Sequence, residues 1–175
     1  DGSVDPPTAN INSADNITYT FTNNINDSIV VERSNIIIDG NGYTLQGNGS
    51  GNGFDLYGIN NVTIKNTNII SFYFGIYLDS ISQNVISRNN ITANGWAGIE
   101  LDHSSNNTIS VNNIAANKNY AIDLNDSVNN TISKNEIESS VGMYAIGIRV
   151  AGSNHNKING NNITANRNDG IWLLY

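Results

Sequence analysis

Short apolar segments of the form Gly-Ile-x-Leu recur along this chain, and their isoleucines are 23, 23, 26 and 23 residues apart. A fixed period of this length is typical of solenoids, in which each repeat buries its apolar side only against a neighbouring repeat. The five copies occupy residues 75–78, 98–101, 121–124, 147–150 and 170–173, with Ala121 in place of Gly in the third and Val150 in place of Leu in the fourth.

Each repeat also contains two other isoleucine positions, so that three short β-branched segments alternate with clusters of Asn, Ser and Gly. This pattern predicts three strands and three turns in every repeat. In the third repeat the expected strands are 108–110, 114–116 and 121–124. The two additional isoleucine columns are Ile64, Ile86, Ile109, Ile132 and Ile158, and Ile69, Ile91, Ile114, Ile137 and Ile163.

Within the third strand, aliphatic residues alternate with a variable residue, so the aliphatic side chains should point inward and the variable ones to solvent. Leucine-rich repeats have a similar period, but the isoleucine columns and the Asn-rich returns favour another solenoid. We therefore predict an all-β, right-handed parallel β-helix with three short strands per rung of about 23 residues.

Residues 34–47 read as an earlier rung with an enlarged Gly-Asn-Gly turn. This rung, followed by Asn-Asn-Thr-Ile-Ser and Gly-Ile-x-Leu repeats, resembles the NosD-like parallel β-helix proteins of the pectin-lyase-like superfamily, whose repeats are abundant in archaeal surface proteins. The resemblance covers residues 17–175. Its name-giving relatives are copper-assembly accessories, whereas this chain has one Met, two His and no Cys. We expect no cofactor.

Polar character comes from amides instead of charges, with 35 Asn and only 13% charged residues. The net charge of -7 and the scattered Lys and Arg give no basic surface for nucleic acid. The longest nearly apolar stretch, residues 69–78, is too short to cross a bilayer. We expect neither nucleic acid binding nor membrane insertion.

The variable positions of the third strand place acidic residues on one face, where Glu100, Asp123 and Arg149 align and Asp102 lies beside them. Two carboxylates on neighbouring rungs would suit glycoside hydrolysis, and a carboxylate beside an arginine would suit a lyase. The alternative is a solvated face with ion pairs between rungs. Because the flanking residues are mostly polar, no raised carboxyl pKa is expected.

Aromatic residues gather in the turn before the third strand, including Phe72, Phe74 and, beside Met143, Tyr144. Three interpretations stay open, namely filling of the corner, a protein interface and stacking against sugar rings. The two histidines, His103 and His155, have no partner at metal-ligand spacing, so no metal site is expected. The candidate contact residues are Tyr73, Trp96, Tyr120, Tyr144 and Trp172.

Asn pairs before the second strand, such as Asn89-Asn90 and Asn161-Asn162, predict an amide ladder along the axis. Nine Asn-x-Ser/Thr sequons are present, and Asn90 and Asn162 are expected to be inaccessible in the ladder. Sequons in turns after the third strand, and those near the start of the chain, are the predicted glycosylation sites. They are Asn16, Asn26, Asn48, Asn106, Asn125 and Asn129.

The two ends differ from the repeats. Residues 1–16, with Pro6-Pro7, are predicted to form an extended arm, and residues 17–175 a β-helix whose last rung has no cap. The partners expected there are copies of the chain, stacked end to end into a filament, or flanking domains.

The leading hypothesis is a secreted, glycosylated structural module of a cell surface or extracellular assembly, for which no enzyme activity is required. The alternative is a β-helix that binds or degrades a polysaccharide, as a hydrolase or lyase, with the aromatic residues and carboxylates as its site.

Overall fold

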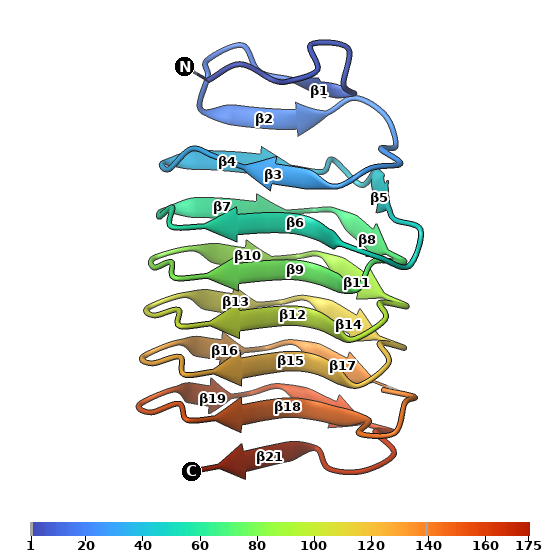
Figure 1. Cartoon of the computed structure of the whole chain (residues 1–175), viewed down its shortest axis with the longest axis vertical. Coiled ribbons are helices and arrows are strands. Elements are labelled where there is room, and N and C mark those ends of the chain that lie inside the picture. The colour runs from blue at the N-terminus through green and yellow to red at the C-terminus, as the bar shows by residue number, and fades with distance from the viewer. Residues whose placement is uncertain (1, 139) are drawn as a thin grey trace.

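A computed structural model describes residues 2–138 and 140–175, and these residues form a right-handed parallel β-solenoid of about seven turns (Figure 1). From β4 onward each turn has three short strands, and no helix occurs in the described residues. No helical segment that could cross a membrane is therefore present in them. The predicted fold class and the rung length of about 23 residues are confirmed.

Three sheets run along the axis, and from β4 onward each rung contributes one parallel strand to each sheet, whereas β1 pairs antiparallel with β2. Sheet A comprises β1 (Ile11–Asn12), β2 (Thr18–Phe21), β4 (Ile36–Asp39), β7 (Val62–Lys65), β10 (Val85–Ser87), β13 (Thr108–Ser110), β16 (Thr131–Ser133) and β19 (Lys157–Asn159). Sheet B comprises β5 (Thr44–Gln46), β8 (Asn68–Ile70), β11 (Asn90–Thr92), β14 (Asn113–Ala115), β17 (Glu136–Glu138) and β20 (Asn162–Thr164). Sheet C comprises β3 (Ile29–Val31), β6 (Asn52–Tyr57), β9 (Phe74–Asp79), β12 (Ala97–Asp102), β15 (Tyr120–Asn125), β18 (Ile146–Ala151) and β21 (Ile171–Leu174).

The core is a set of isoleucine stacks, because like residues pair directly across neighbouring rungs. Ile86 pairs with Ile109 in sheet A, and Ile91 pairs with Ile114 in sheet B. These side chains are fully buried, as is Ile99 in sheet C. Parallel strands about 4.8 Å apart bring such β-branched side chains into continuous contact. The repeat period therefore sets both the strand register and the core.

Buried asparagines form the predicted ladder at the corner between sheets A and B. The side-chain amide of Asn112 donates to Oδ1 of Asn135 at 3.0 Å and to the Ile86 carbonyl at 2.9 Å. Its own Oδ1 accepts the backbone N–H of Asn89 at 3.0 Å. Each ladder residue thus satisfies turn groups on both sides, which buried backbone requires.

The ladder contains the first asparagine of each pair, which corrects one expectation about the sequons. Asn90 and Asn162 are the second members and begin strands, with Asn90 half-buried and Asn162 exposed. Because successive side chains in a strand point to opposite faces, the residue that follows each ladder asparagine points outward. These two sequons are therefore not enclosed in the ladder.

The residues before the first regular rung lie folded against it. Strand β1 pairs antiparallel with β2, and the Tyr19 hydroxyl donates to the Gly2 carbonyl at 2.8 Å. Val4 packs against the core cluster. The division of the chain at residue 16 stays a prediction.

Candidate functional site

The outer face of sheet C carries the aligned side chains that the repeat register predicts. Tyr77 pairs with Glu100, Glu100 with Asp123, and Asp123 with Arg149 along the axis. Trp172 follows in β21. We call Tyr77, Glu100, Asp123 and Arg149 the central column. Asp55 of β6 precedes Tyr77 in the same register, and the sequence pattern did not reveal it.

Two residues of the central column are buried although they point away from the core. The exposed fraction is 8% for Glu100 and 2% for Asp123. This corrects the expectation that the variable residues of this strand face solvent. Large side chains on adjacent rungs, which are about 4.8 Å apart, cover the shorter carboxyl groups. One of them is Arg149, whose guanidinium lies 5.6 Å from the centre of the Tyr120 ring.

Arg149 neutralises one of the two buried carboxyl groups. Its Nη1 donates to Oδ1 and Oδ2 of Asp123 at 2.8 and 2.9 Å. By contrast, Oε2 of Glu100 is a buried side-chain oxygen with no hydrogen-bond partner in the described residues. Since a buried charge needs a partner, Glu100 is suited to the protonated, neutral form.

The electrostatics of the column follow from burial first and from neighbouring charges second. Burial, together with the nearby Asp123 carboxyl, raises the pKa of Glu100 to about 9. Burial also raises the pKa of Asp123, although Arg149 opposes this shift. The pKa of Tyr77 rises to about 12 because of burial and the Asp79 carboxylate. The expectation that no carboxyl pKa is raised here is therefore wrong.

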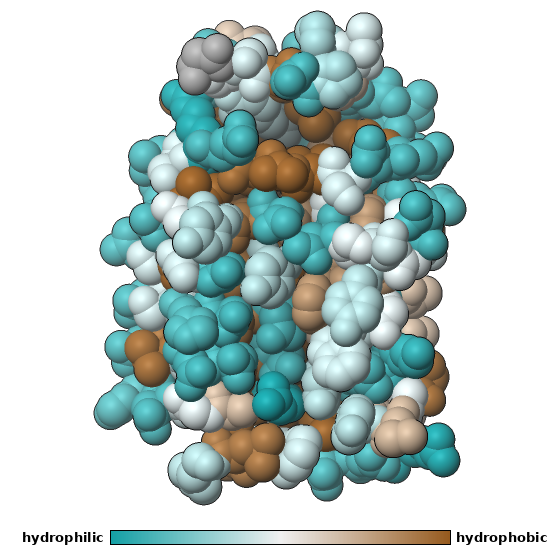
Figure 2. All heavy atoms as spheres, in the orientation of Figure 1, coloured by the Kyte–Doolittle hydropathy of each residue, from teal (hydrophilic) through white to brown (hydrophobic). Residues whose placement is uncertain are grey.

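Aromatic rings form a row at the corner where the chain enters sheet C, with one ring on each of four rungs. Tyr73 stacks on Trp96 with ring centres 5.9 Å apart, Trp96 meets Tyr120 edge-on at 5.9 Å, and Tyr120 stacks on Tyr144 at 6.4 Å. We call these four residues the aromatic row. The space-filling view faces sheet C and shows large pale side chains beside a hydrophilic central strip (Figure 2).

The aromatic residues of this corner divide between the core and the surface. Phe72 is buried in the core cluster, and Tyr120 is buried against Ala97 and Ile146. Tyr73 and Tyr144 are exposed. The structure therefore brings four of the five predicted contact residues into one row, while Trp172 packs against the small cluster around Tyr120.

A second outward column places acidic groups beside the first. Asp79 pairs with Asp102, and Nδ1 of His103 lies 2.9 Å from Oδ1 of Asp102. One ligand-type atom from each of these three residues lies within 4.8 Å of the others. His103 therefore has neighbours at metal-ligand spacing, contrary to expectation, and the expected absence of a metal stays a prediction.

Most predicted glycosylation sites lie on the surface. Asn16, Asn26, Asn48, Asn106 and Asn129 are exposed. Asn125 differs, because it is the last residue of β15 and not part of a turn. It is half-buried, and its side-chain amide donates to Oδ1 of Asp102 at 2.9 Å. Glycosylation of these residues stays a prediction.

Comparison with protein families assigns the fold to a known group. Residues 9–147 match the family described as the right-handed β-helix region, which is most of the chain. The chain belongs to the right-handed β-helix family. Among curated proteins, no sequence matches this β-helix.

Solved structures similar to this β-helix include the periplasmic alginate epimerase AlgG. A mutant of that enzyme superposes with a TM-score of 0.75 at 24% identity over 83% of this chain, and the unmodified enzyme gives 0.75 and 24% over 81%. The β-helix spans about a third of the length of AlgG, 34%. The enzymatically active domain of a bacteriophage CBA120 tailspike is more distant, with a TM-score of 0.47 and 15% identity over 73% of this chain and 22% of that one.

The sequence pattern predicts which residues align in columns along this β-helix. It does not predict that the side chains of Glu100 and Asp123 are buried. The Gly-Ile-x-Leu register gives the alignment of Glu100, Asp123 and Arg149 directly. The structure adds that Arg149, which binds Asp123, also lies over the ring of Tyr120 at the start of β15.

Proposed function

We propose that the outer face of sheet C binds a polysaccharide chain laid along the solenoid axis. The observation that carries this proposal is the aromatic row, in which Tyr73 and Tyr144 are exposed and Trp96 is half-buried, beside a strip of polar side chains. Aromatic rings next to convergent polar groups suit sugars, whose rings have apolar faces and hydroxyl edges. The similarity to AlgG, an alginate epimerase, is in fold and agrees with a carbohydrate ligand.

The charge of this face favours a neutral or amine-bearing polysaccharide. Asp55, Asp79 and Asp102 lie outward on neighbouring rungs, and the guanidinium of Arg149 is already paired with Asp123. A chain of uronate sugars would meet like charge along these two columns. The ligand class therefore differs from alginate.

Binding, and not cleavage, is the activity that the central column supports. A general acid has to come within hydrogen-bonding distance of the bond that it protonates. Glu100 and Asp123 are buried beneath neighbouring side chains, and Asp123 is held by Arg149. We assign these residues the role of fixing the binding face. Release of reducing ends by the protein, with loss of that release in Glu100→Gln, would replace this assignment with a hydrolase.

Replacing Trp96 with alanine is expected to weaken polysaccharide binding at least tenfold. The indole stacks on Tyr73 and meets Tyr120, so its loss removes a contact surface and also breaks the row. A ring that stacks on a nucleic-acid base contributes about 1–3 kcal/mol, and a tenfold loss of sugar affinity, about 1.4 kcal/mol, lies at the lower end of this range. Titration calorimetry with neutral oligosaccharides, after a glycan array has identified a ligand, measures the change.

Tyr175→Ala is the control for this experiment, because Tyr175 is an exposed aromatic residue outside the row. It should bind like the unmodified protein. Equal affinity of the Trp96→Ala variant and the unmodified protein would refute polysaccharide binding by the aromatic row.

We also propose an extracellular or envelope location, with sugars attached at exposed sequons such as Asn106 and Asn129, and a NosD-like relationship within the superfamily. The periplasmic location of AlgG agrees with this location. Exposed Asn106 and Asn129 lie in turns where an attached glycan would meet solvent.

A second proposal retains the structural role, in which copies of the chain associate through the apolar side chains exposed on β21. Leu173 of β21 has 54% of its surface exposed, and Ile171 is also exposed. Figure 2 shows apolar side chains over this end of sheet C. A strand edge with apolar side chains is a template for pairing with another chain.

Sedimentation velocity tests this association. The unmodified protein should form dimers or longer assemblies at tens of micromolar, and Leu173→Asp should shift it toward the monomer by placing a charge in the contact. Val111→Asp is the control, because Val111 is an exposed apolar residue away from this end. A monomer at every concentration would contradict self-association.

A further inference from the structure

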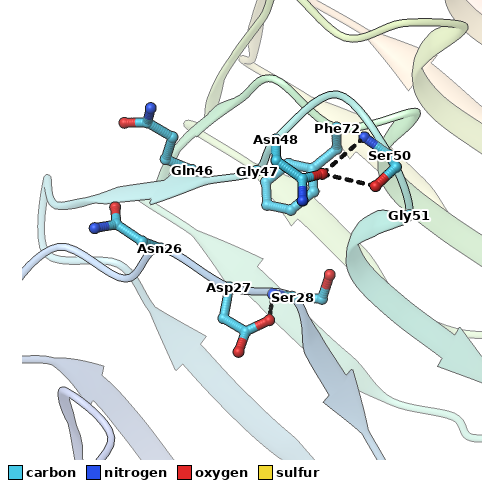
Figure 3. A pocket seen from close by; sticks show the side chains of 9 residues that line it. All are labelled: Asn26, Asp27, Ser28, Gln46, Gly47, Asn48, Ser50, Gly51 and Phe72. Atoms are coloured by element: carbon cyan, nitrogen blue, oxygen red, sulfur yellow. Dashed lines mark hydrogen bonds between the residues drawn. The ribbon is translucent and has the colours of Figure 1, made fainter.

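A pocket of about 400 Å³ lies at the same corner as the aromatic row, on the preceding rungs. Its two walls are the segment before β3, residues 26–28, and the turn between β5 and β6, residues 46–51 (Figure 3). Segments from successive rungs form it, and the turn at 47–51 is longer than the next turn at this corner, residues 71–73. The pocket is outside the central column.

Each wall of the pocket carries a polar side chain that a local hydrogen bond orients, Asn48 on one wall and Asp27 on the other. Oδ1 of Asn48 accepts both the backbone N–H and the hydroxyl of Ser50, at 3.2 and 2.6 Å. This fixes the side chain so that its amide nitrogen points into the space toward Asp27 and Ser28 (Figure 3). Oδ1 of Asp27 accepts the backbone N–H of Ser28 at 2.7 Å, which leaves its Oδ2 as an acceptor. The amide nitrogen of Asn48 thus points into the pocket from one wall, and the Asp27 carboxylate belongs to the other wall.

An aromatic ring forms the floor. Phe72 is 1% exposed and lines the pocket beneath Gly47. A Cβ atom at Gly47 would lie 2.5 Å from Cδ1 of Phe72 and 2.4 Å from the Ser71 carbonyl, so only glycine lets the chain pass this close to the ring. An apolar floor with polar walls is the usual composition of a small-molecule site.

The pocket adjoins the first ring of the aromatic row. The backbone N–H of Tyr73 donates to the Gly51 carbonyl at 2.8 Å, and Gly49 donates to the Ser71 carbonyl at 2.6 Å. A chain lying over Tyr73 would therefore reach the pocket within one rung. The lining contains one charged group, Asp27, and no cation.

We propose that this pocket binds the terminal sugar unit of a neutral polysaccharide, of the hexose or N-acetylhexosamine class, whose following units lie on the aromatic row. This inference rests on the proposed function and gives the bound chain a direction along the axis. Uronate, sulfate and phosphate groups are disfavoured, because Asp27 would repel them. A glycan attached to Asn48 would occupy the same space, so the binding form of the protein is unmodified at this residue.

Nuclear magnetic resonance titration of unglycosylated protein tests the proposal with glucose, galactose, mannose and N-acetylglucosamine, and with glucuronate for comparison. The backbone N–H signals of Ser28, Ser50 and Gly51 report on the pocket, and the indole N–H signal of Trp96 reports on the row. At least one neutral sugar should shift the pocket signals in a saturable way. Glucuronate should shift them at least tenfold more weakly.

Asn48→Asp is the matching variant, because it keeps the acceptor for Ser50 and replaces the amide donor with an acceptor. The Asn48→Asp variant should bind the neutral sugar about tenfold more weakly. It loses one hydrogen bond from the amide and leaves a sugar oxygen without a donor. Asn129→Asp introduces the same chemical change at an exposed turn and should bind normally. An unchanged remainder of the spectrum verifies that each variant is folded.

The outcomes separate this inference from the proposed function. Longer neutral oligosaccharides that shift Trp96 without moving the pocket signals would overturn the pocket and leave the row as the binding surface. If the longer oligosaccharides shift only the pocket signals, binding along the row is refuted and the pocket remains as a site for a single sugar. Absence of shifts at both places, or equal affinity of Asn48→Asp and the unmodified protein, would overturn the pocket.

Discussion

Replacing Asn112 with alanine is expected to lower the free energy of unfolding by about 3 kcal/mol, because it removes a fully bonded rung of the amide ladder. The variant deprives the buried backbone N–H of Asn89 of its acceptor and the Ile86 carbonyl of one donor. It also breaks the amide contact with Asn135. Urea unfolding followed by circular dichroism measures the loss.

Asn113→Ala provides a matched control one residue along the chain. Asn113 is exposed, and its side chain donates to Oδ1 of Asn90 on the surface. Its removal should change the free energy of unfolding by less than about 0.5 kcal/mol. Equal destabilisation by the two substitutions would show that burial of the ladder is not what stabilises these turns.

Replacing Glu100 with glutamine is expected to remove a large pH dependence of stability. The pKa of Glu100 is raised from 4.5 to about 9 in the folded protein, so the folded state keeps a proton that the unfolded state releases. The contribution is fully present below about pH 4.5 and is lost as the pH rises toward 9. The largest slope for one proton is about 1.4 kcal/mol per pH unit.

Glutamine imitates the protonated carboxyl and does not titrate, so the variant should gain stability relative to the unmodified protein from pH 5 to pH 9. Urea unfolding at intervals of one pH unit measures this difference. Glu138→Gln is the control, because Glu138 is an exposed glutamate on β17 and its replacement should leave the pH profile parallel to that of the unmodified protein. Parallel profiles for Glu100→Gln as well would contradict a buried, protonated Glu100.

Most of the fold could be predicted from the sequence because a solenoid repeats one set of local contacts. Identical spacing of isoleucines means that each one meets its counterpart on the next rung, as Ile86 meets Ile109. The ladder follows in the same way from the recurring asparagines. The prediction that Asn90 and Asn162 are inaccessible was wrong. In a pair of asparagines, the position of the strand boundary decides which one faces inward, and both of these residues begin strands.

The candidate site was predictable only as an alignment. The sequence by itself determined that Glu100, Asp123 and Arg149 share a column, since register depends on spacing alone. It did not give the burial of the two carboxyl groups or the association of His103 with Asp102. Burial of an outward side chain depends on the sizes and rotamers of residues on neighbouring rungs, which the repeat pattern does not specify.

The sequence thus determined the solenoid, its three strands per rung and the columns on its surface, because these follow from a period of apolar residues. Only the tertiary structure decided which polar columns are enclosed and where a pocket opens. The raised pKa of Glu100 and the walls around Asn48 both arise between rungs. Their physical origin is the same, since exclusion of water at a point depends on every side chain that surrounds it and not on the residue alone.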